Sequence, residues 1–323
     1  MGIILLGFPP DQISADQLKR IRAIAVDRQV VVSNDRQTIE HIQNDIEIAA
    51  TALPLDLHLL VLRGEKLKWV QQWGAGVNWI MQYPELIRKD FILTNVSGIH
   101  AIPISEQIVG YLLAFARSLH HAIRAQGERG WWKPERSTLF ELAGKTMLII
   151  GTGAIGARTA YLAQALDMRV LGVRRNPERE INGVEAMFAP DQLLELLPEA
   201  DFVVLTIPLT QETKGMIGEP ELRAMKSSAY ILNIGRGGTI QEKVLVRALQ
   251  KGWIAGAGLD VFEKEPLPED SPLWDMDNVI ITAHYSGSTP HYNERAMRIF
   301  TDNLRRYMAG EPLKNVVDKK LGY

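Results

Sequence analysis

Residues 145–175 read KTMLIIGTGAIGARTAYLAQALDMRVLGVRR, and they decide the fold. An apolar stretch runs into three glycines, Gly151, Gly153 and Gly156, and an alanine- and leucine-rich segment leads on to a second apolar stretch. Between a strand and a helix, the first glycine permits a tight turn, the second lets the backbone approach a pyrophosphate, and the third lets helix and strand pack closely. Because the N–H groups that open a helix attract anions, the stretch predicts a dinucleotide-binding domain.

The chain is long enough for two domains. Its 323 residues exceed the roughly 250–300 at which single cores stop growing. Short apolar runs alternate with helical patterns on both sides of residue 100, which predicts two α/β domains with mostly parallel sheets. We expect strands near 3–7, 30–32, 46–49, 69–71, 92–94, 145–150, 169–173, 186–188, 202–206, 230–233, 257–260 and 279–282.

Two amphipathic segments predict longer helices. Ser105, shortly after Pro103, suits the start of a helix, and apolar residues recur at 108, 112, 115, 119 and 123. We expect one helix of about twenty residues that connects the domains. The loop after it contains Trp131 and Trp132, which serve either as interface anchors or as partly buried packing residues. A last helix is expected over 293–308, where it would return to the first domain.

Composition excludes several classes of function. The net charge of −2 gives no reason to expect nucleic acid or an anionic membrane as a partner. The chain has no cysteine, which rules out disulfides, thiolate nucleophiles and cysteine-ligated metals. Residues 1–8 have no basic leader and read as an opening strand, and no apolar run is long enough to span a bilayer, so a cytoplasmic protein is expected. The histidines show no metal-ligand spacing, and no metal is expected.

Polar residues follow three expected strands in succession. Arg236 lies in a glycine-rich turn, Glu265 follows the next strand, and His284 follows the one after that. Ligands of open parallel sheets bind outside the carboxyl ends of the strands, so these side chains and the glycine turn should share one edge. Each residue alone has an ordinary alternative as a solvated charge or a structural histidine. The three together favour a catalytic site.

The ordered set of motifs resembles the D-isomer-specific 2-hydroxyacid dehydrogenases along essentially the whole chain. The motifs are QWGAGV (72–77), NVSGI (95–99), GTGAIG (151–156), NIGRG (233–237), GLDVFEKEP (258–266) and TAHYSG (282–287). The resemblance implies two doubly wound α/β domains, with a Rossmann cofactor domain inserted into a flavodoxin-like substrate domain. Residues 1–98 and 289–323 would bind substrate in a cleft, and residues 99–288 would bind the dinucleotide.

The resemblance also implies a role for each catalytic residue. Arg236 would pair with the substrate carboxylate and polarise the keto oxygen. His284 would give a proton to that oxygen during reduction, and Glu265 would hold the imidazole and favour its charged form. Glu263 does not match the family's position, and we interpret it as solvated.

Further contacts are implied at matching positions. Cofactor contacts are expected from Gly151, Thr152, Gly153, Ala154, Ile155, Gly156, Arg174, Arg175, Ile207, Pro208, Thr213, Ile234, Gly235, Asp260, Ser286 and Gly287. Substrate contacts are expected from Ala75, Gly76, Val77, Ser97, Gly98, Ile99, Arg236, His284 and Tyr285.

The chain departs from the family pattern in three places. NAD-dependent relatives usually have an acid after the second cofactor-domain strand, where this chain has Arg174 followed by Arg175. Because two arginines would accept a 2′-phosphate, we expect NADP(H) to be preferred over NAD(H); the alternative is a pair of exposed arginines that border the adenine. Ala283 replaces a frequent proline, and Gln107 stands where many relatives have histidine.

These patterns predict an NAD(P)H-dependent oxidoreductase that reversibly reduces a small 2-oxo acid, such as glyoxylate or hydroxypyruvate, to the D-2-hydroxy acid. Family analogy suggests a homodimer formed through the cofactor domains. Two alternatives stay open: a catalytically weak dinucleotide-sensing protein like the corepressors of the same family, and a formate- or phosphite-type dehydrogenase on the same scaffold.

Overall fold

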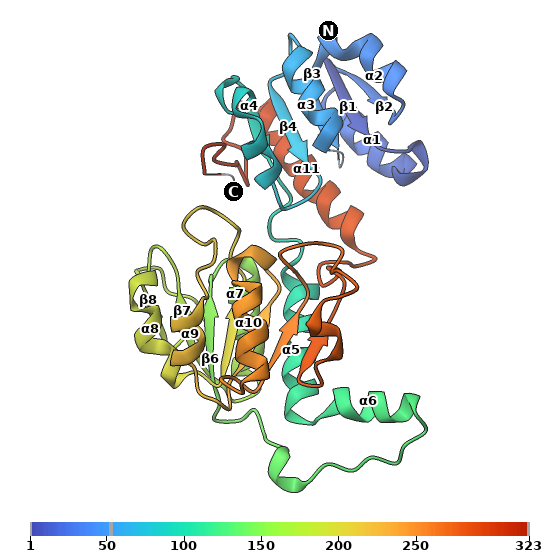
Figure 1. Cartoon of the computed structure of the whole chain (residues 1–323). Helices are drawn as coiled ribbons and strands as arrows, with labels where there is room; N and C mark the ends of the chain where they lie inside the picture. Colours follow the sequence, from blue (N-terminus) through green and yellow to red (C-terminus); the bar gives the residue numbers. More distant parts are fainter. Residues whose placement is uncertain (1, 52–53, 322–323) are drawn as a thin grey trace. The chain divides into compact units, whose positions relative to one another are not determined.

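The computed structural model describes residues 2–51 and 54–321 (Figure 1). The chain forms two compact units. Unit 1 comprises Met1–Ile99 and Thr289–Tyr323, and unit 2 comprises His100–Ser288. Each unit contains one parallel sheet with helices packed on both of its faces, so the expected class of two doubly wound α/β sheets is confirmed.

Unit 1 has a five-stranded parallel sheet in the order β2-β1-β3-β4-β5, which is the flavodoxin-like order. The strands are β1 (Ile3–Gly7), β2 (Gln29–Val32), β3 (Ile46–Thr51), β4 (Trp69–Gln72) and β5 (Ile92–Thr94). Around them lie α1 (Ala15–Ile24), α2 (Arg36–Ile42), α3 (Pro54–Arg63) and α4 (Pro84–Arg88). Both sheet faces are apolar because both are covered: Ile3 and Leu5 join one core, and Ile4 and Leu6 join the other.

The last helix, α11 (Tyr292–Met308), packs within unit 1. Its buried side chains include Ala296, Phe300 and Leu304, which recur every four residues and therefore share one face. Phe300 stacks on Trp69 of β4 with ring centroids 5.5 Å apart. The segment expected to return to the first domain thus completes the core of unit 1.

Unit 2 has a seven-stranded parallel sheet in the order β12-β11-β10-β9-β6-β7-β8. The strands are β6 (Thr146–Ile150), β7 (Arg169–Val173), β8 (Ala186–Phe188), β9 (Phe202–Leu205), β10 (Tyr230–Asn233), β11 (Gly256–Leu259) and β12 (Val279–Ile281). Its main helices are α5 (Ala101–Ala116), α6 (Leu119–Gly127), α7 (Ala154–Gln164), α8 (Leu193–Leu196), α9 (Glu219–Ala224) and α10 (Glu242–Gln250). The strand order reverses between β6 and β9, and this switch point is where doubly wound sheets bind ligands.

We expected a single long helix from Ser105 onward, and both its predicted start and its predicted end are wrong. Helix α5 already begins at Ala101, because Pro103 is tolerated in a first turn, where its missing N–H is not needed. The helix ends at Ala116, and Ser118 takes a left-handed conformation (φ 52°) before α6 starts. As a result Phe115 is buried, whereas Ile123 on α6 is 67% exposed.

Among the described residues, no helix is long and apolar enough to cross a membrane. The cytoplasmic location stays a prediction.

Candidate active site

The turn after β6 constrains its three glycines differently. Gly151 has φ 98°, and a Cβ added there would lie 2.6 Å from Ile207 Cγ2. A Cβ on Gly156 would lie 2.3 Å from the carbonyl oxygen of Gly151, so only glycine lets α7 start this close to the strand. A Cβ on Gly153 would meet no atom within 4 Å. The open side of Gly153, at the start of α7, therefore fits the close approach of a pyrophosphate.

Other expected cofactor residues lie beside this turn. The carbonyl oxygen of Ile207, just beyond β9, lies 2.6 Å from the position of a Cβ on Gly235, just beyond β10. The turns after β6, β9 and β10 thus meet at one sheet edge. Thr152 is different, because its hydroxyl faces Met187 Sδ on β8 at 3.5 Å.

The segment after β9 closes on itself. The Thr213 hydroxyl donates to the carbonyl oxygen of Pro208 at 2.7 Å, and the Thr210 N–H donates to Thr213 Oγ1 at 2.8 Å. Residues 208–213 therefore form a hydrogen-bonded loop of their own. Thr213 stabilises this loop with its side chain, which the sequence pattern did not indicate.

The two arginines after β7 have different surroundings. The Nη1 atom of Arg174 is buried, with no hydrogen-bond partner within residues 2–51 and 54–321. Arg175 forms an exposed ion pair with Glu212, with Nη2 and Oε2 2.6 Å apart. Sequence reasoning missed Glu212, since it lies 37 residues away and belongs to no motif. Such exposed pairs contribute only about 0–1 kcal/mol.

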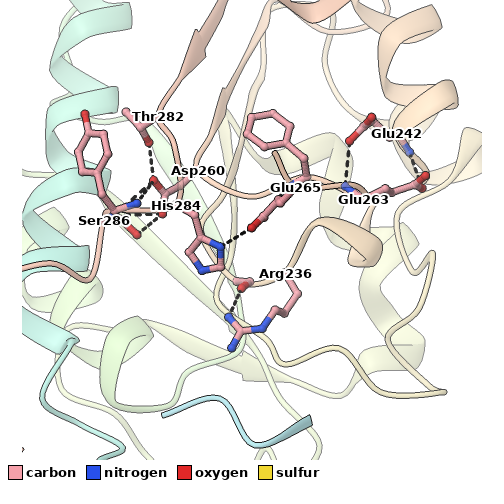
Figure 2. A network of polar contacts seen from close by, with 11 residues as sticks. Arg236, Glu242, Asp260, Glu263, Glu265, Thr282, His284 and Ser286 are labelled. Carbon is pink, nitrogen blue, oxygen red and sulfur yellow. Dashed lines mark hydrogen bonds and ion pairs between the residues drawn. The ribbon is translucent and has the colours of Figure 1, made fainter. Parts of the chain in front are cut away.

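Arg236, Glu265 and His284 come together in unit 2 (Figure 2). The His284 Nδ1 lies 2.6 Å from Glu265 Oε2, and the other oxygen of Glu265 accepts the Phe262 N–H at 3.0 Å. Arg236 lies nearby with Nη1 donating to the carbonyl oxygen of Gly235 at 2.7 Å. Burial lowers the pKa of Arg236, and the negative charge of Glu265 opposes that shift.

A backbone contact brings Arg236 and Glu265 close. A Cβ on Gly237 would lie 1.9 Å from the carbonyl carbon of Phe262, so the chain after β11 passes directly over the turn after β10. No side chain fits between them. Gly237 is therefore required for the arginine turn and the Glu265 loop to lie together.

His284 itself has a left-handed backbone, with φ 51°. A residue other than glycine in this region costs about 1–3 kcal/mol and persists only where its surroundings hold it. The His284 N–H donates to the carbonyl oxygen of Asp260 at 2.9 Å. The sequence could not reveal this backbone conformation at His284.

The Asp260 carboxylate holds the loop that carries His284 (Figure 2). Asp260 is fully buried; its Oδ1 accepts the Thr282 hydroxyl at 2.5 Å and the Tyr285 N–H at 3.2 Å. Its Oδ2 accepts the Ser286 N–H at 3.1 Å and the Ser286 hydroxyl. The side chain of Asp260, expected to contact a cofactor, is thus occupied in fastening both ends of the loop.

Glu263 does more than the solvated role we expected. Its side chain is exposed, but its Oε1 accepts the Glu242 N–H at 3.0 Å, and Glu242 Oε2 accepts the Glu263 N–H at 3.0 Å (Figure 2). This reciprocal pair ties the start of α10 to the Glu265 loop. No local pattern could have shown it, because the two residues are 21 positions apart.

In unit 1, Asn95 joins the two turns that contain the remaining expected substrate residues. Its Nδ2 donates to the carbonyl oxygen of Ala75 at 2.9 Å, and its Oδ1 accepts the Ser97 N–H at 2.9 Å. Gly98 has φ 101°, and Val77 is buried. Residues 75–77 and 97–99 therefore follow neighbouring strands, β4 and β5, as one connected pair of turns.

The arrangement in unit 2 has a definite chemical capability. A carboxylate bound to Nδ1 orients the imidazole and leaves Nε2 as the atom that can exchange a proton with a ligand. A guanidinium beside it can pair with a ligand carboxylate. Within the described residues there is no cluster of three or more histidine, aspartate or glutamate side chains that could hold a metal.

Comparisons with known proteins find similar sequences over most of the chain. A family model described as D-isomer specific 2-hydroxyacid dehydrogenase, NAD binding domain, matches residues 109–286. A glyoxylate reductase of Korarchaeum cryptofilum is 37% identical over 262 residues, which are 79% of this chain and 77% of the relative. A D-3-phosphoglycerate dehydrogenase of Methanocaldococcus jannaschii is 37% identical over 80% of this chain and 49% of the relative.

Solved structures extend the similarity to the whole fold. A D-isomer specific 2-hydroxyacid dehydrogenase of Xanthobacter autotrophicus, in complex with NADPH and MES, has a TM-score of 0.83 at 30% identity and covers 100% of this chain and 99% of its own. An NADPH-dependent glyoxylate/hydroxypyruvate reductase of Sinorhizobium meliloti, with NADP and sulfate, has a TM-score of 0.82 at 28% identity and covers 100% of both chains.

Proposed function

Because the chain belongs to the D-isomer specific 2-hydroxyacid dehydrogenase family, and is thus an NAD(P)-dependent oxidoreductase acting on CH–OH groups, we propose that it reversibly reduces a small 2-oxo acid to the D-2-hydroxy acid. Glyoxylate and hydroxypyruvate are the substrates we propose first, because they appear in the names of its relatives. The observation that carries the proposal is the 2.6 Å bond between His284 and Glu265 beside Arg236.

The proposed reaction uses three side chains. Arg236 pairs with the substrate carboxylate and polarises the adjacent keto oxygen, for which its planar guanidinium is suited. The hydride for C2 would be supplied by the reduced nicotinamide when the cofactor is bound. His284 donates the proton on Nε2 to the developing alkoxide, which completes the hydroxyl group, and Glu265 holds the imidazole ring in place through Nδ1. In the reverse direction His284 takes up the hydroxyl proton.

In this proposal the two units have different roles in binding. Unit 2 binds the dinucleotide at the glycine turn, a role favoured by the match of residues 109–286 to an NAD binding domain and by the open side of Gly153. Further cofactor contacts come from the neighbouring turns. The turns 75–77 and 97–99 of unit 1 are proposed as further substrate contacts, and Tyr285 of unit 2, half exposed beside His284, would contact the substrate side chain.

A direct assay tests the proposed activity. Oxidation of NADPH and NADH would be followed at 340 nm with glyoxylate, hydroxypyruvate, pyruvate and longer 2-oxo acids, and reduction of NADP+ and NAD+ would be followed with formate and phosphite. Turnover of a 2-oxo acid supports the proposal. Cofactor binding without any turnover would support a dinucleotide-sensing protein, and activity confined to formate or phosphite would replace the substrate class.

We propose that the enzyme prefers NADP(H), because Arg174 has a buried donor without a protein partner at the end of β7. Replacing Arg174 with alanine should lower kcat/KM for NADPH by about ten- to a hundredfold, since one charge-assisted hydrogen bond contributes about 1.5–3 kcal/mol. The value for NADH should change little. The measurement is kcat/KM with each cofactor at saturating 2-oxo acid.

Glu212→Gln is the variant to compare with Arg174→Ala, because it changes the surroundings of the neighbouring Arg175. It removes the ion pair with Arg175, so the affinity for NADPH should stay equal or rise a few-fold. If wild-type enzyme used NADH as well as NADPH, or if Arg174→Ala weakened both cofactors equally, the proposed preference would be wrong.

We also propose a homodimer formed through unit 2. Helix α6 and the segment after it extend away from the rest of unit 2 (Figure 1) and expose Leu119, Ile123, Trp131 and Trp132. Trp131 is 99% exposed, and four large apolar side chains on one projecting segment favour an interface. This supports the anchoring role of the tryptophans over the packing role.

Ile123→Asp should therefore shift the protein from dimer to monomer, because it places a charge in an apolar interface. Light scattering coupled to gel filtration measures the molar mass. Val26→Asp is the control, since Val26 is 80% exposed in unit 1 and its replacement should leave the mass unchanged. A monomeric wild-type protein would contradict the proposal.

A further inference from the structure

Helix α5 contributes a buried tyrosine to the hydrogen bonds behind His284. The Tyr111 hydroxyl lies 2.5 Å from Thr282 Oγ1, and that hydroxyl donates to Asp260 Oδ1 at 2.5 Å. The Gln107 side chain lies one helical turn earlier on the same face, and its interaction with the Tyr111 hydroxyl lowers the pKa of Tyr111 against the larger effect of burial. A continuous chain of side chains therefore runs from α5 to Asp260, which fastens the loop of His284.

The direction of each hydrogen bond in this series follows from the Asp260 carboxyl group at its end. The Asp260 side chain accepts every one of its hydrogen bonds: from the hydroxyls of Thr282 and Ser286 and from the N–H groups of Tyr285 and Ser286. Thr282 uses its single proton on Asp260, so the proton between Thr282 and Tyr111 belongs to Tyr111. The oxygen of Tyr111 is then free to accept a hydrogen bond, and the Gln107 amide is the donor nearest to it along the same face of α5. Each donation polarises the next one in the same direction.

The surroundings of Tyr111 keep it in this role. Its ring is buried and lies against β11, where a Cβ on Gly258 would come within 2.9 Å of Tyr111 Cγ. A larger residue at 258 would push the ring, and its hydroxyl, away from Thr282. Burial also raises the pKa of Tyr111 to about 12, so the hydroxyl remains a donor throughout the usual assay range.

We propose that Tyr111, supported by Gln107, is a positioning residue of this enzyme: through Thr282 and Asp260 it holds the loop 282–286 so that His284 keeps its left-handed backbone and its place beside Glu265. This inference rests on the proposed role of His284 as proton donor. It assigns a function to the α5 face that lies behind the catalytic loop. Gln107, a departure from the family pattern, is then the outermost polar side chain that acts on Tyr111.

The consequence is an effect on turnover more than on binding. Tyr111→Phe keeps the buried ring and removes only the donor to Thr282, which leaves Thr282 and Asp260 less firmly oriented. The loss of one such bond should lower kcat about two- to tenfold, with a smaller change in KM for the 2-oxo acid and for NADPH. Gln107→Leu should have the same effect in weaker form.

Tyr230→Phe is the matched control. Tyr230 is also a largely buried tyrosine of unit 2, its ring stacks on Phe202 with centroids 5.5 Å apart, and its hydroxyl has no hydrogen-bond partner within the described part of the chain. Removing that hydroxyl should leave kcat within twofold. Equal kcat values for Tyr111→Phe and Tyr230→Phe, or a change confined to KM, would overturn the proposal.

A spectroscopic readout separates this inference from the proposed reaction. In protein with ¹⁵N-labelled histidine, the ring nitrogen signals of His284, assigned by their loss in His284→Gln, should shift in Tyr111→Phe and stay in place in Tyr230→Phe. These signal changes are expected even if no 2-oxo acid is turned over. Absence of turnover would contradict the proposed reaction but not the positioning role of Tyr111. Unchanged His284 signals in Tyr111→Phe would defeat the positioning role. Should Tyr111→Phe fail to fold, Gln107→Leu carries the same comparison.

The double variant Gln107→Leu/Tyr111→Phe tests the linkage along the chain. If Gln107 acts only through Tyr111, the double variant should have the kcat of Tyr111→Phe alone. Additive losses would mean that the two side chains act separately, which would remove Gln107 from the proposal.

Discussion

Replacing His284 with glutamine should lower kcat by roughly 10²–10⁴, the range for loss of a general acid–base group, while the affinity for NADPH stays nearly unchanged. The reason is that His284 offers the proton on Nε2, whereas the fold of the cofactor turn does not depend on it. Steady-state kinetics with the best 2-oxo acid and fluorescence titration with NADPH measure the two effects.

Two further variants guard this interpretation. Asparagine accepts the left-handed backbone more readily than glutamine, so His284→Asn tests whether strain at φ 51° rather than loss of the imidazole causes the defect. His284→Gln and His284→Asn should be equally inactive. His291→Gln, at an exposed histidine beside the start of α11, should keep full activity. A His284 variant with more than a tenth of wild-type kcat would remove this residue from the proposed mechanism.

Arg236→Ala should lower kcat/KM for the 2-oxo acid by about two to four powers of ten. A bidentate pair with a carboxylate comprises two charge-assisted hydrogen bonds of about 1.5–3 kcal/mol each. Most of the loss should appear as a raised KM, with part in kcat because the keto oxygen is no longer polarised. The measurement is a full kinetic analysis with saturating NADPH.

Arg236→Lys provides the informative comparison, since it keeps the charge but not the planar fork, and it should recover only part of the loss. Arg223→Ala removes an exposed arginine of α9 that pairs with Glu219, and its kinetics should match the wild type. If Arg236→Ala left KM unchanged, the carboxylate clamp would have to be sought among other residues.

Local patterns in the sequence predict the strands well. Buried parallel strands read as short apolar runs, so β6 and β7 stand out on either side of the glycine turn, and the order of the motifs places Arg236, Glu265 and His284 at successive strand ends. Periodicity failed at the end of α5. The apolar repeat continues through Leu119 and Ile123, and nothing local shows that the helix breaks at Ser118.

Local patterns do not predict the contacts at the site between residues far apart in the sequence. Glu212 reaches Arg175 across 37 residues, and Glu263 and Glu242 exchange hydrogen bonds across 21. The side chain of Asp260 sits in a motif, but only the folded chain shows that it binds the loop of His284. Such contacts depend on which turns meet in three dimensions, and a linear pattern contains no measure of that.

The passage of the Phe262 backbone over Gly237 limits how this scaffold can be redesigned. Because the two backbones touch without an intervening side chain, the arginine and the glutamate cannot be respaced by mutating either loop alone; even alanine at 237 would force the chains apart. A designer who wants a longer or shorter reacting group would have to preserve this crossing and reshape the walls around it. We expect libraries that vary residue 237 to yield inactive clones, and libraries that vary the exposed Tyr285 to yield altered selectivity.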